Sequence, residues 1–305
     1  MTEGKPFQVI DTSSWRVDDT EAIGEEEKIW LLSPEGTRWL FKPVVRHEGW
    51  QQGEDWAERV ACEVARLMDV PAAEIELATR GGRPGCLSRS VIPAGWEMQH
   101  GAVMLSGLVD GYQSRVKYRT GHNLANIEAA LRRCGPPSMA MLSDSFDGFA
   151  AFVGFLLFDA LIANCDRHDE NWSVLRDPLS DEPPALAPSY DHANSLGFNL
   201  QDTARTRWLK GRKIAEWAEK GRATRFERTA DTPAPTLVAL ARDAIDRTSD
   251  GVRTYWRDRV GSLTEDDFRA ILDAVPNLSD PGRTFALQLL QVNIRRVLDG
   301  CWQRT

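Results

Sequence analysis

The hydrophobic pattern is strand-like in the first third of the chain. Apolar residues alternate over 28–32 and again over 38–42, and the intervening Ser33-Pro34-Glu35-Gly36 has the composition of a turn, so this stretch predicts a β-hairpin. Two further strands are predicted over 73–79 and 86–92, which are separated by residues rich in glycine and proline. We therefore expect a small antiparallel sheet in the first third.

Helical periodicity appears once inside this first third and dominates the rest of the chain. The predicted helices span 54–68, 122–133, 145–163 and 280–298, with several more after residue 200. Periodicity lapses over 96–105, where we expect the chain to cross between two lobes. A strand-rich part followed by a helical part is typical of an α+β fold, and we expect the two lobes to span 1–103 and 104–305.

Composition narrows the classes of protein without naming one. The 305 residues are 42% hydrophobic and carry a net charge of −8, so we expect a soluble protein with neither nucleic acid nor a membrane as its partner. The first ten residues lack the basic and apolar regions of a secretion signal, so we expect none. Asp159 interrupts the longest apolar run well short of a membrane span. The five cysteines are scattered and lack a C-x-x-C pair, which predicts reduced thiols in a cytoplasmic protein.

The chemistry is concentrated in a polar loop, residues 164–171, which follows the apolar run. Asp166 and Asn171 have the Asp-x-x-x-x-Asn spacing of a kinase catalytic loop, in which the aspartate accepts the proton of the attacking hydroxyl. The asparagine and a later aspartate hold magnesium on the phosphates in such enzymes, and Asp191 is placed to be that later aspartate. This spacing favours an ATP-dependent kinase.

Two other interpretations of these residues stay open from spacing alone. His168 and His192 lie close in sequence to the carboxylates, as in a metal-dependent hydrolase that activates water. Asn171 would then have no role, and the histidines lack the i, i+4 spacing of a helical zinc motif. A purely structural turn is the second alternative, because Asp and Asn side chains often bond to their own backbone.

The nucleotide-binding residues are less sharply marked. Lys42 ends a predicted strand, and Glu58 in the following helix can reach it, as in the lysine–glutamate pair of a kinase small lobe. Glu63 is a rival partner, and both glutamates can equally be the solvated face of a helix. No glycine-rich phosphate loop is recognisable, so Gly24, with Lys28 beside it, is the candidate for contacting phosphate.

Four longer segments extend the similarity beyond single residues: "KIWLLSPEGTRWLFKP", "GEDWAERVACEVARLMDVPAAEIELA", "FLLFDALIANCDRHDENWSVL" and "LAPSYDHANSLG". Together they resemble the HipA-like serine/threonine kinases, a bacterial family with a diverged protein-kinase fold, and the likeness runs from about residue 24 to 298. The resemblance implies a two-lobed fold, ATP and Mg²⁺ as cofactors, and transfer of the γ-phosphoryl group to a protein hydroxyl, with autophosphorylation as a further reaction.

The same resemblance implies a role for each candidate. Lys42 is similar to the ATP lysine of the family and Glu58 to its partner, while Asp166 lies in the general-base position. Asn171 and Asp191 occupy the positions of the family's magnesium ligands, and His168 matches a motif histidine that shapes the loop near the nucleotide. The protein substrate is not identifiable, and no antitoxin-type partner is visible in the sequence.

The sequence leaves open the class of acceptor, whether the protein is active at all, and the role of one basic stretch. A kinase-fold enzyme acting on a lipid or small-molecule acceptor, and an inactive nucleotide-binding regulator, are the alternatives to a protein kinase. A basic stretch over 205–228 predicts either a docking site for an acidic or nucleic-acid-bound substrate or an ordinary solvated helix face, which is the commoner case.

Overall fold

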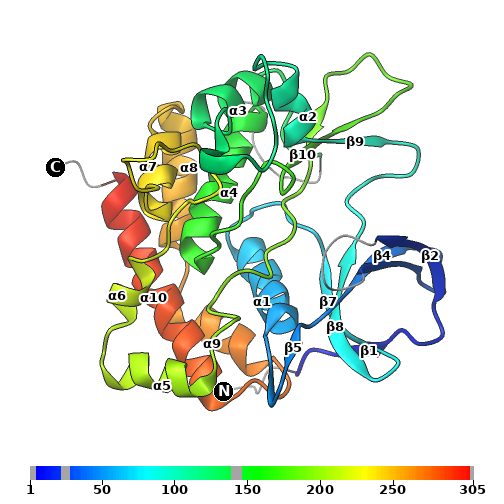
Figure 1. The fold of residues 1–305 in the computed structure, drawn as a ribbon, viewed down its shortest axis with the longest axis vertical. Coiled ribbons are helices and arrows are strands. Elements are labelled where there is room, and N and C mark those ends of the chain that lie inside the picture. Colours follow the sequence, from blue (N-terminus) through cyan, green and yellow to red (C-terminus); the bar gives the residue numbers. More distant parts are fainter. Residues whose placement is uncertain (1–4, 22–27, 139–145, 303–305) are drawn as a thin grey trace.

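The computed structural model describes residues 5–21, 28–138 and 146–302. The sheet lies on one side of the molecule and most of the helices lie on the other, which confirms the α+β expectation (Figure 1). Among the described helices, none is long and apolar enough to cross a membrane.

A six-stranded sheet forms most of the strand-rich part, with the strand order β1-β7-β8-β4-β3-β2. Its strands are β1 (Val9–Asp11), β2 (Arg16–Glu21), β3 (Lys28–Leu32), β4 (Arg38–Pro43), β7 (Ile75–Arg80) and β8 (Arg83–Arg89). β1 pairs with β7 in parallel and the other pairs are antiparallel. The predicted hairpin is therefore confirmed as β3–β4, whereas β1 and β2 had no clear signal in the polar amino-terminal segment.

The second predicted pair of strands is real but more tightly connected than expected. Gly81 and Gly82 both have positive φ angles, 55° and 76°, and form the whole connection between β7 and β8. Two consecutive residues with positive φ make the hairpin turn that matches the twist of the flanking strands. The strands therefore continue through Arg80 and Arg83 into residues predicted to be loop.

The stretch over 96–105, where we expect the chain to cross between two lobes, has regular structure that its lapse of periodicity did not predict. This stretch forms β9 (Glu97–His100) and α2 (Gly101–Ser106). β9 pairs with β10 (Ser173–Arg176), and β10 pairs with β11 (Ala185–Leu186), to make a second, three-stranded sheet. The partner of β9 lies more than seventy residues away in the chain, so local periodicity could not reveal this strand.

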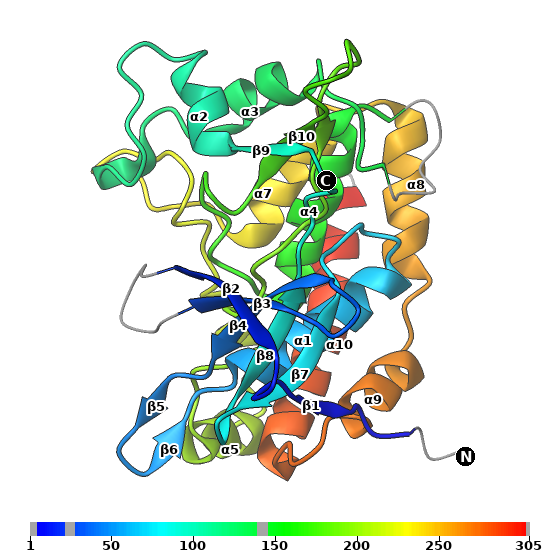
Figure 2. The same ribbon diagram turned by 90° about the vertical axis from the view of Figure 1, so that its right-hand side faces the viewer.

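Helices make up the remainder, together with a short hairpin that projects from the molecule (Figure 2). The hairpin consists of β5 (Arg46–His47) and β6 (Trp50–Gln51). The helices are α1 (Glu54–Leu67), α3 (Leu124–Leu131), α4 (Gly148–Ile162), α5 (Asp202–Lys210), α6 (Ile214–Ala218), α7 (Leu237–Ile245), α8 (Asp250–Gly261), α9 (Glu265–Asp273) and α10 (Asp280–Trp302), with a 3₁₀ turn at Lys117–Arg119.

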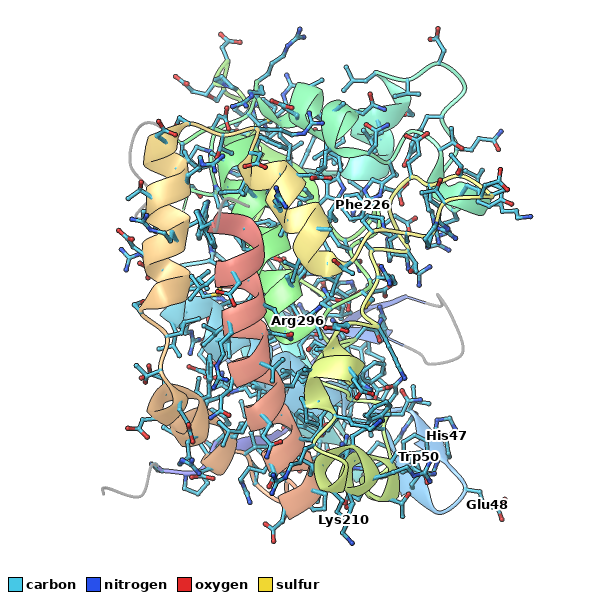
Figure 3. The ribbon with its side chains drawn as sticks, turned by 90° about the vertical axis from the view of Figure 1, so that its left-hand side faces the viewer. His47, Glu48, Trp50, Lys210, Phe226 and Arg296 are labelled. Atoms are coloured by element: carbon cyan, nitrogen blue, oxygen red, sulfur yellow. The ribbon has the colours of Figure 1, made fainter. Side chains whose placement is uncertain are left out.

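The core is built around α4, whose fifteen residues are all buried. α10 runs the length of the helical part and contacts α4 and α7 (Figure 3). α1 belongs to the same core, because Val60 and Val64 are fully buried in one hydrophobic cluster with residues of α4. The helix that carries Glu58 is thus packed against the helical part as well as against β7 and β8.

Candidate active site

A cavity of about 560 Å³ lies between the six-stranded sheet and the polar loop at 164–171. Its lining includes Lys28, Lys42, His168, Asn171 and Asp191, five of the residues predicted from the sequence. They come from β3, from β4 and from two loops that are separated by about twenty residues. The fold therefore brings most of the candidate set together in one cleft.

Lys42 faces this cleft because of the alternation along β4. Trp39 and Phe41 are buried on one face of the strand, in a small cluster with Leu31 and Leu87. Successive residues of a strand point to opposite faces, so Leu40 and Lys42 project from the other face and line the cavity. β4 lies between β3 and β8, which holds the lysine in the interior of the sheet.

Glu58 is the carboxylate partner of Lys42 on the helix side. The Lys42 ammonium lies 3.0 Å from Glu58 Oε2, and Glu58 Oε1 accepts a hydrogen bond of 2.7 Å from the backbone N–H of His192. Glu58 is fully buried, so both of its oxygens have the partners that a buried charge requires. The rival, Glu63, instead pairs with Arg59 and Arg66 away from the cleft.

Asp191 is the second carboxylate on the lysine, at 2.8 Å from Nζ to Oδ1. Its φ angle of 62° lies in the left-handed region, which aspartate tolerates better than most residues with a side chain. The charge of Lys42 holds the pKa of Asp191 well below its usual range despite burial, and Lys28 adds to this effect. Burial favours a neutral Lys42, but Asp191 and Glu58 outweigh it and raise the lysine pKa.

The loop at 164–171 is held in shape by a buried ion pair. α4 ends at Ala163 in a left-handed conformation, which turns the chain back toward Asp159 in the last turn of the helix. Arg167 makes two bonds of 2.8 Å to the Asp159 carboxylate and one of 2.7 Å to the carbonyl of Asn171. Both side chains are at most 4% exposed, so the guanidinium clamps the two ends of the loop from inside.

Asp166 and Asn171 sit on the outer side of this clamp. The Asn171 amide donates from Nδ2 to the carbonyl of Asp166 at 2.8 Å, which leaves its amide oxygen available to another ligand. The Asp166 carboxylate accepts hydrogen bonds of 2.6 Å from Arg225 Nε and 2.6 Å from Asn194 Nδ2. Asp166 is not among the residues that line the cavity and lies beside it.

The other predicted residues are His168, Lys28 and Gly24, of which the first two line the cavity. His168 lines the cavity and its Nδ1 accepts the backbone N–H of Glu170 at 3.1 Å, so it shapes the loop from within. Burial lowers the pKa of His168. Lys28 lines the cavity from β3. Gly24 lies outside the described residues.

The donor atoms in the cleft fit magnesium. Magnesium prefers oxygen ligands and usually takes one or two from protein, with phosphates and water completing its shell. Asn171 offers an amide oxygen and Asp191 a carboxylate whose second oxygen is not engaged by Lys42. Within the described residues, no three His, Cys, Asp or Glu side chains are grouped to hold a metal, so the hydrolase alternative has no such site there.

A second cavity, of about 640 Å³, lies on another face, between the β5–β6 hairpin and α5. It is larger than the cleft, but none of the predicted catalytic, nucleotide-binding or metal-binding residues lines it. Volume alone does not select a candidate site, so we take the cleft in which Lys42, Glu58 and Asp191 converge as the candidate active site.

Comparison with known proteins identifies the family. The model of the HipA-like C-terminal domain matches residues 20–256, well over half of the chain. The chain belongs to the HipA-like C-terminal domain family. It is a kinase-fold protein, because its structure aligns with the proinflammatory kinase CtkA of Helicobacter pylori with a TM-score of 0.71 over 96% of this chain and 97% of CtkA, at 16% identity.

Two further relatives are more distant or shorter matches. HipA of Shewanella oneidensis, solved in complex with HipB and operator DNA, aligns with a TM-score of 0.54 and 13% identity, covering 93% of this chain and 66% of HipA. The protein Y4dM of Sinorhizobium fredii is 28% identical over 99 residues, which is 32% of this chain. The match spans about a quarter of that curated relative, 24% of its length.

Several residues that support the site had no individual signal. Arg225 and Asn194 contact Asp166 from 59 and 28 residues further along the chain. Asp159 did carry a signal, because a carboxylate inside an apolar helix requires a buried partner, and that partner is Arg167.

Proposed function

We propose that this HipA-like protein is an ATP- and magnesium-dependent serine/threonine protein kinase. The observation that carries the proposal is the convergence on one ammonium group, Lys42 Nζ, of Glu58 from α1 and Asp191 from a distant loop. A lysine and glutamate pair beside an acidic magnesium ligand is the arrangement that protein kinases require for activity. The nucleotide would lie between a lobe of residues 1–103 and a lobe of residues 104–305.

In this proposal each residue acts through position and charge. Lys42, oriented by Glu58, binds the phosphates of ATP, and Lys28 contributes a second cation at the same cavity. Asn171 and Asp191 would hold magnesium, which when bound neutralises negative charge on the transferring phosphate. Gly24 is retained as a candidate for contacting phosphate from the segment before β3.

In the proposed transfer step, Asp166 accepts the proton of the acceptor hydroxyl. The acceptor hydroxyl oxygen forms a bond to the γ-phosphorus as the bond between that phosphorus and the bridging oxygen breaks, and ADP leaves with the bridging oxygen. The hydroxyl proton passes to the Asp166 carboxylate. Because Arg167 fixes the loop from the buried side, Asp166 and Asn171 keep a constant separation during transfer.

The state of the cysteines supports a reducing compartment. All five cysteines are free thiols, and burial raises the pKa of Cys62, Cys86, Cys134, Cys165 and Cys301. Unpaired thiols are usual in the cytoplasm, where we propose that the enzyme acts.

A panel of acceptors tests which class of molecule receives the phosphoryl group. Wild-type protein is incubated with γ-labelled ATP, magnesium and, separately, a generic protein, phosphoinositide vesicles or no acceptor, and products are identified by mass spectrometry. The proposal expects phosphoserine or phosphothreonine on protein. Labelled lipid alone would favour the lipid-kinase alternative, and ATP binding without transfer to any acceptor would favour the inactive regulator.

A further inference from the structure

Four arginines lie on two hydrogen-bonded segments near the carboxylate of Asp166. Arg225 contacts it directly at 2.6 Å, and Arg119, Arg222 and Arg228 are carried on the segments that flank Arg225; we call these four residues the arginine patch. The surrounding protein has a net charge of −8, so the patch is a local reversal of sign. The patch and Asp166 are not among the residues that line the cavity with Lys42. In the proposed reaction the acceptor hydroxyl approaches Asp166.

The fold fixes the patch by anchoring its backbone. The segment after α6 alternates between buried Ala223 and Phe226 and outward-facing arginines, and the Phe226 ring packs 4.6 Å from the ring of His122 (Figure 3). The backbone N–H of Glu227 bonds to the carbonyl of His122 at 2.8 Å, and that of Arg228 to Tyr118 at 3.0 Å. These bonds hold the segment against the turn that carries Arg119.

The positive charges in the patch are poorly compensated. Among the described residues, no carboxylate forms an ion pair with Arg119, Arg222 or Arg228. Arg119 Nη1 is buried and has no hydrogen-bond partner there, a state that costs free energy unless another group supplies an acceptor. Burial, and then the neighbouring charges of Arg225 and Arg228, lower the pKa of Arg119 against the pull of Asp169.

Three other cations of the basic stretch at 205–228 do have partners. Arg205 is buried and bonded to Asp202 and to the carbonyl of Gly197. Lys213 pairs with Glu216, and Lys220 lies 4.4 Å above the Trp208 ring. Part of the basic stretch is therefore an ordinary helix face, which was one of its two predicted roles. The three patch arginines that belong to the stretch lie at its carboxyl end and form a separate feature.

We propose that the arginine patch binds an acidic segment of the protein acceptor, so that this kinase prefers a serine or threonine flanked by aspartate, glutamate or phosphorylated residues. The inference rests on the proposed kinase function. On binding, Arg225 exchanges its contact with Asp166 for an acidic group of the acceptor, and the acceptor hydroxyl takes the vacated place on Oδ1. Breaking the contact between Arg225 and Asp166 costs little free energy, because the Arg225 side chain is 39% exposed and exposed ion pairs contribute little to stability.

A peptide fits this patch better than a nucleic acid does. The arginines border Asp166 and Asp169, and these carboxylates repel a continuous phosphate backbone. A short segment with one or two acidic side chains can pair with the guanidiniums while its hydroxyl lies beside Asp166. Arginine binds carboxylate and phosphate groups through paired hydrogen bonds, so both acidic and phosphorylated flanks are suitable.

The test compares matched serine peptides whose flanking residues are acidic, neutral or basic. We expect kcat/KM for the acidic peptide to exceed that for the neutral peptide by about tenfold, mainly through a lower KM, since complementary charges of this kind contribute strongly to binding. The double variant Arg222→Glu/Arg228→Glu should lose this preference. The control Arg207→Glu/Lys210→Glu changes two exposed cations of α5, and this control should keep the preference. In Figure 3, Lys210 lies at the lower edge of the molecule, far from Phe226 in its upper part.

Equilibrium binding separates this inference from the proposed function. Fluorescence anisotropy of labelled peptides with alanine in place of serine measures docking without transfer. Preferential binding of the acidic peptide, lost in the patch variant, supports the inference even if no acceptor is phosphorylated. Equal binding of all three peptides, or a patch variant that binds like the wild type, would overturn it, as would binding of single-stranded nucleic acid in preference to every peptide.

Discussion

The ammonium of Lys42 and the carboxylate of Asp191 lie 2.8 Å apart, although 149 residues separate them in the chain. Each group belongs to a different structural setting, one at the centre of the sheet and the other in a loop of the helical part. Their contact closes the inner end of the cleft, and Glu58 joins it from α1. We regard this three-residue cluster as the centre of the proposed nucleotide site.

Replacement of Lys42 by methionine should remove activity and weaken the fold. We expect transfer from ATP to fall at least about 100-fold, because a charge aimed at the phosphates is lost. The free energy of unfolding should fall by about 2 kcal/mol, because buried Glu58 loses its cationic partner. Urea denaturation and a transfer assay measure the two effects. The control Lys210→Met, on the exposed end of α5, should match the wild type in both; a fully active Lys42→Met protein would refute the assignment.

In variants of the buried Asp159–Arg167 pair, we expect stability to be recoverable without activity. Arg167→Met leaves the Asp159 carboxylate buried without its cation, and should lower the free energy of unfolding by about 3–5 kcal/mol. The double variant Asp159→Leu/Arg167→Met should recover much of that loss, since a well-packed apolar pair often replaces a buried ion pair at little cost.

Activity should stay low in both variants, because neither can restore the bond from Arg167 to the Asn171 carbonyl. Arg257→Met, which removes an exposed pair with Asp258, is the control and should change stability by less than about 0.5 kcal/mol. A single Arg167→Met variant as stable as the wild type would contradict the proposed clamp.

His122 predicts a pH dependence of stability. Trp172 donates to its Nε2 at 3.1 Å, so the neutral ring carries its proton on Nδ1 and donates to the Arg225 carbonyl at 2.7 Å. Burial lowers the pKa of His122 from 6.5 to about 4. Between these values the unfolded chain binds a proton that the folded chain does not, so stability falls as pH falls from 6.5 to 4.

The variant His122→Gln isolates this contribution. Its stability should depend on pH less steeply than that of the wild type, by up to about 1.4 kcal/mol per pH unit in that range. His192, whose pKa burial lowers to about 3, and Asp55, whose pKa burial raises to about 6, act in both proteins and cancel in the comparison. Urea midpoints at several pH values measure the slopes, and identical slopes would show that His122 is not the neutral buried group.

Asp191 predicts the metal dependence of the reaction. Asp191→Asn should raise the magnesium concentration needed for half-maximal transfer and lower the maximal rate about 100-fold or more, because a charged oxygen ligand is lost. Asp169→Asn changes another carboxylate near the same loop, one that accepts a hydrogen bond from Tyr112 and does not line the cavity. We expect this control to retain the magnesium dependence of the wild type. An Asp191→Asn protein with unchanged magnesium dependence would remove the aspartate from the proposed ligand set.

Local sequence was sufficient for the elements and motifs that depend on near neighbours. The β3–β4 hairpin, α1 and the apolar α4 followed from periodicity, and the family from motifs spread over most of the chain. The spacing of Asp166 and Asn171 marked the loop, and the position of Lys42 at a strand end marked the cleft. The hairpin, the helices and the loop spacing are each encoded within a few turns or one hairpin, whereas the family likeness is spread over most of the chain.

Features that depend on distant pairing could not be predicted in the same way. β9 is a strand because β10 offers its edge, and the polar sequence of β9 has no strand periodicity of its own. Arg225 was visible only as one cation in a basic stretch, because its contact with Asp166 arises when α7 and the segment before it pack on α4. The partner of a residue is thus the hardest property to derive from one sequence.

We propose that ATP bound at Lys42 and Asp191 donates its γ-phosphoryl group in a reaction that needs Asp166. The most direct test measures γ-phosphate transfer and ATP binding side by side, in wild type and in Asp166→Asn, with magnesium present and by intact mass. We predict equal ATP binding in both proteins, with phosphate appearing on serine or threonine in the wild type and a loss of at least about 100-fold in the variant. Equal transfer by both proteins, or no ATP binding by the wild type, would contradict the proposed function.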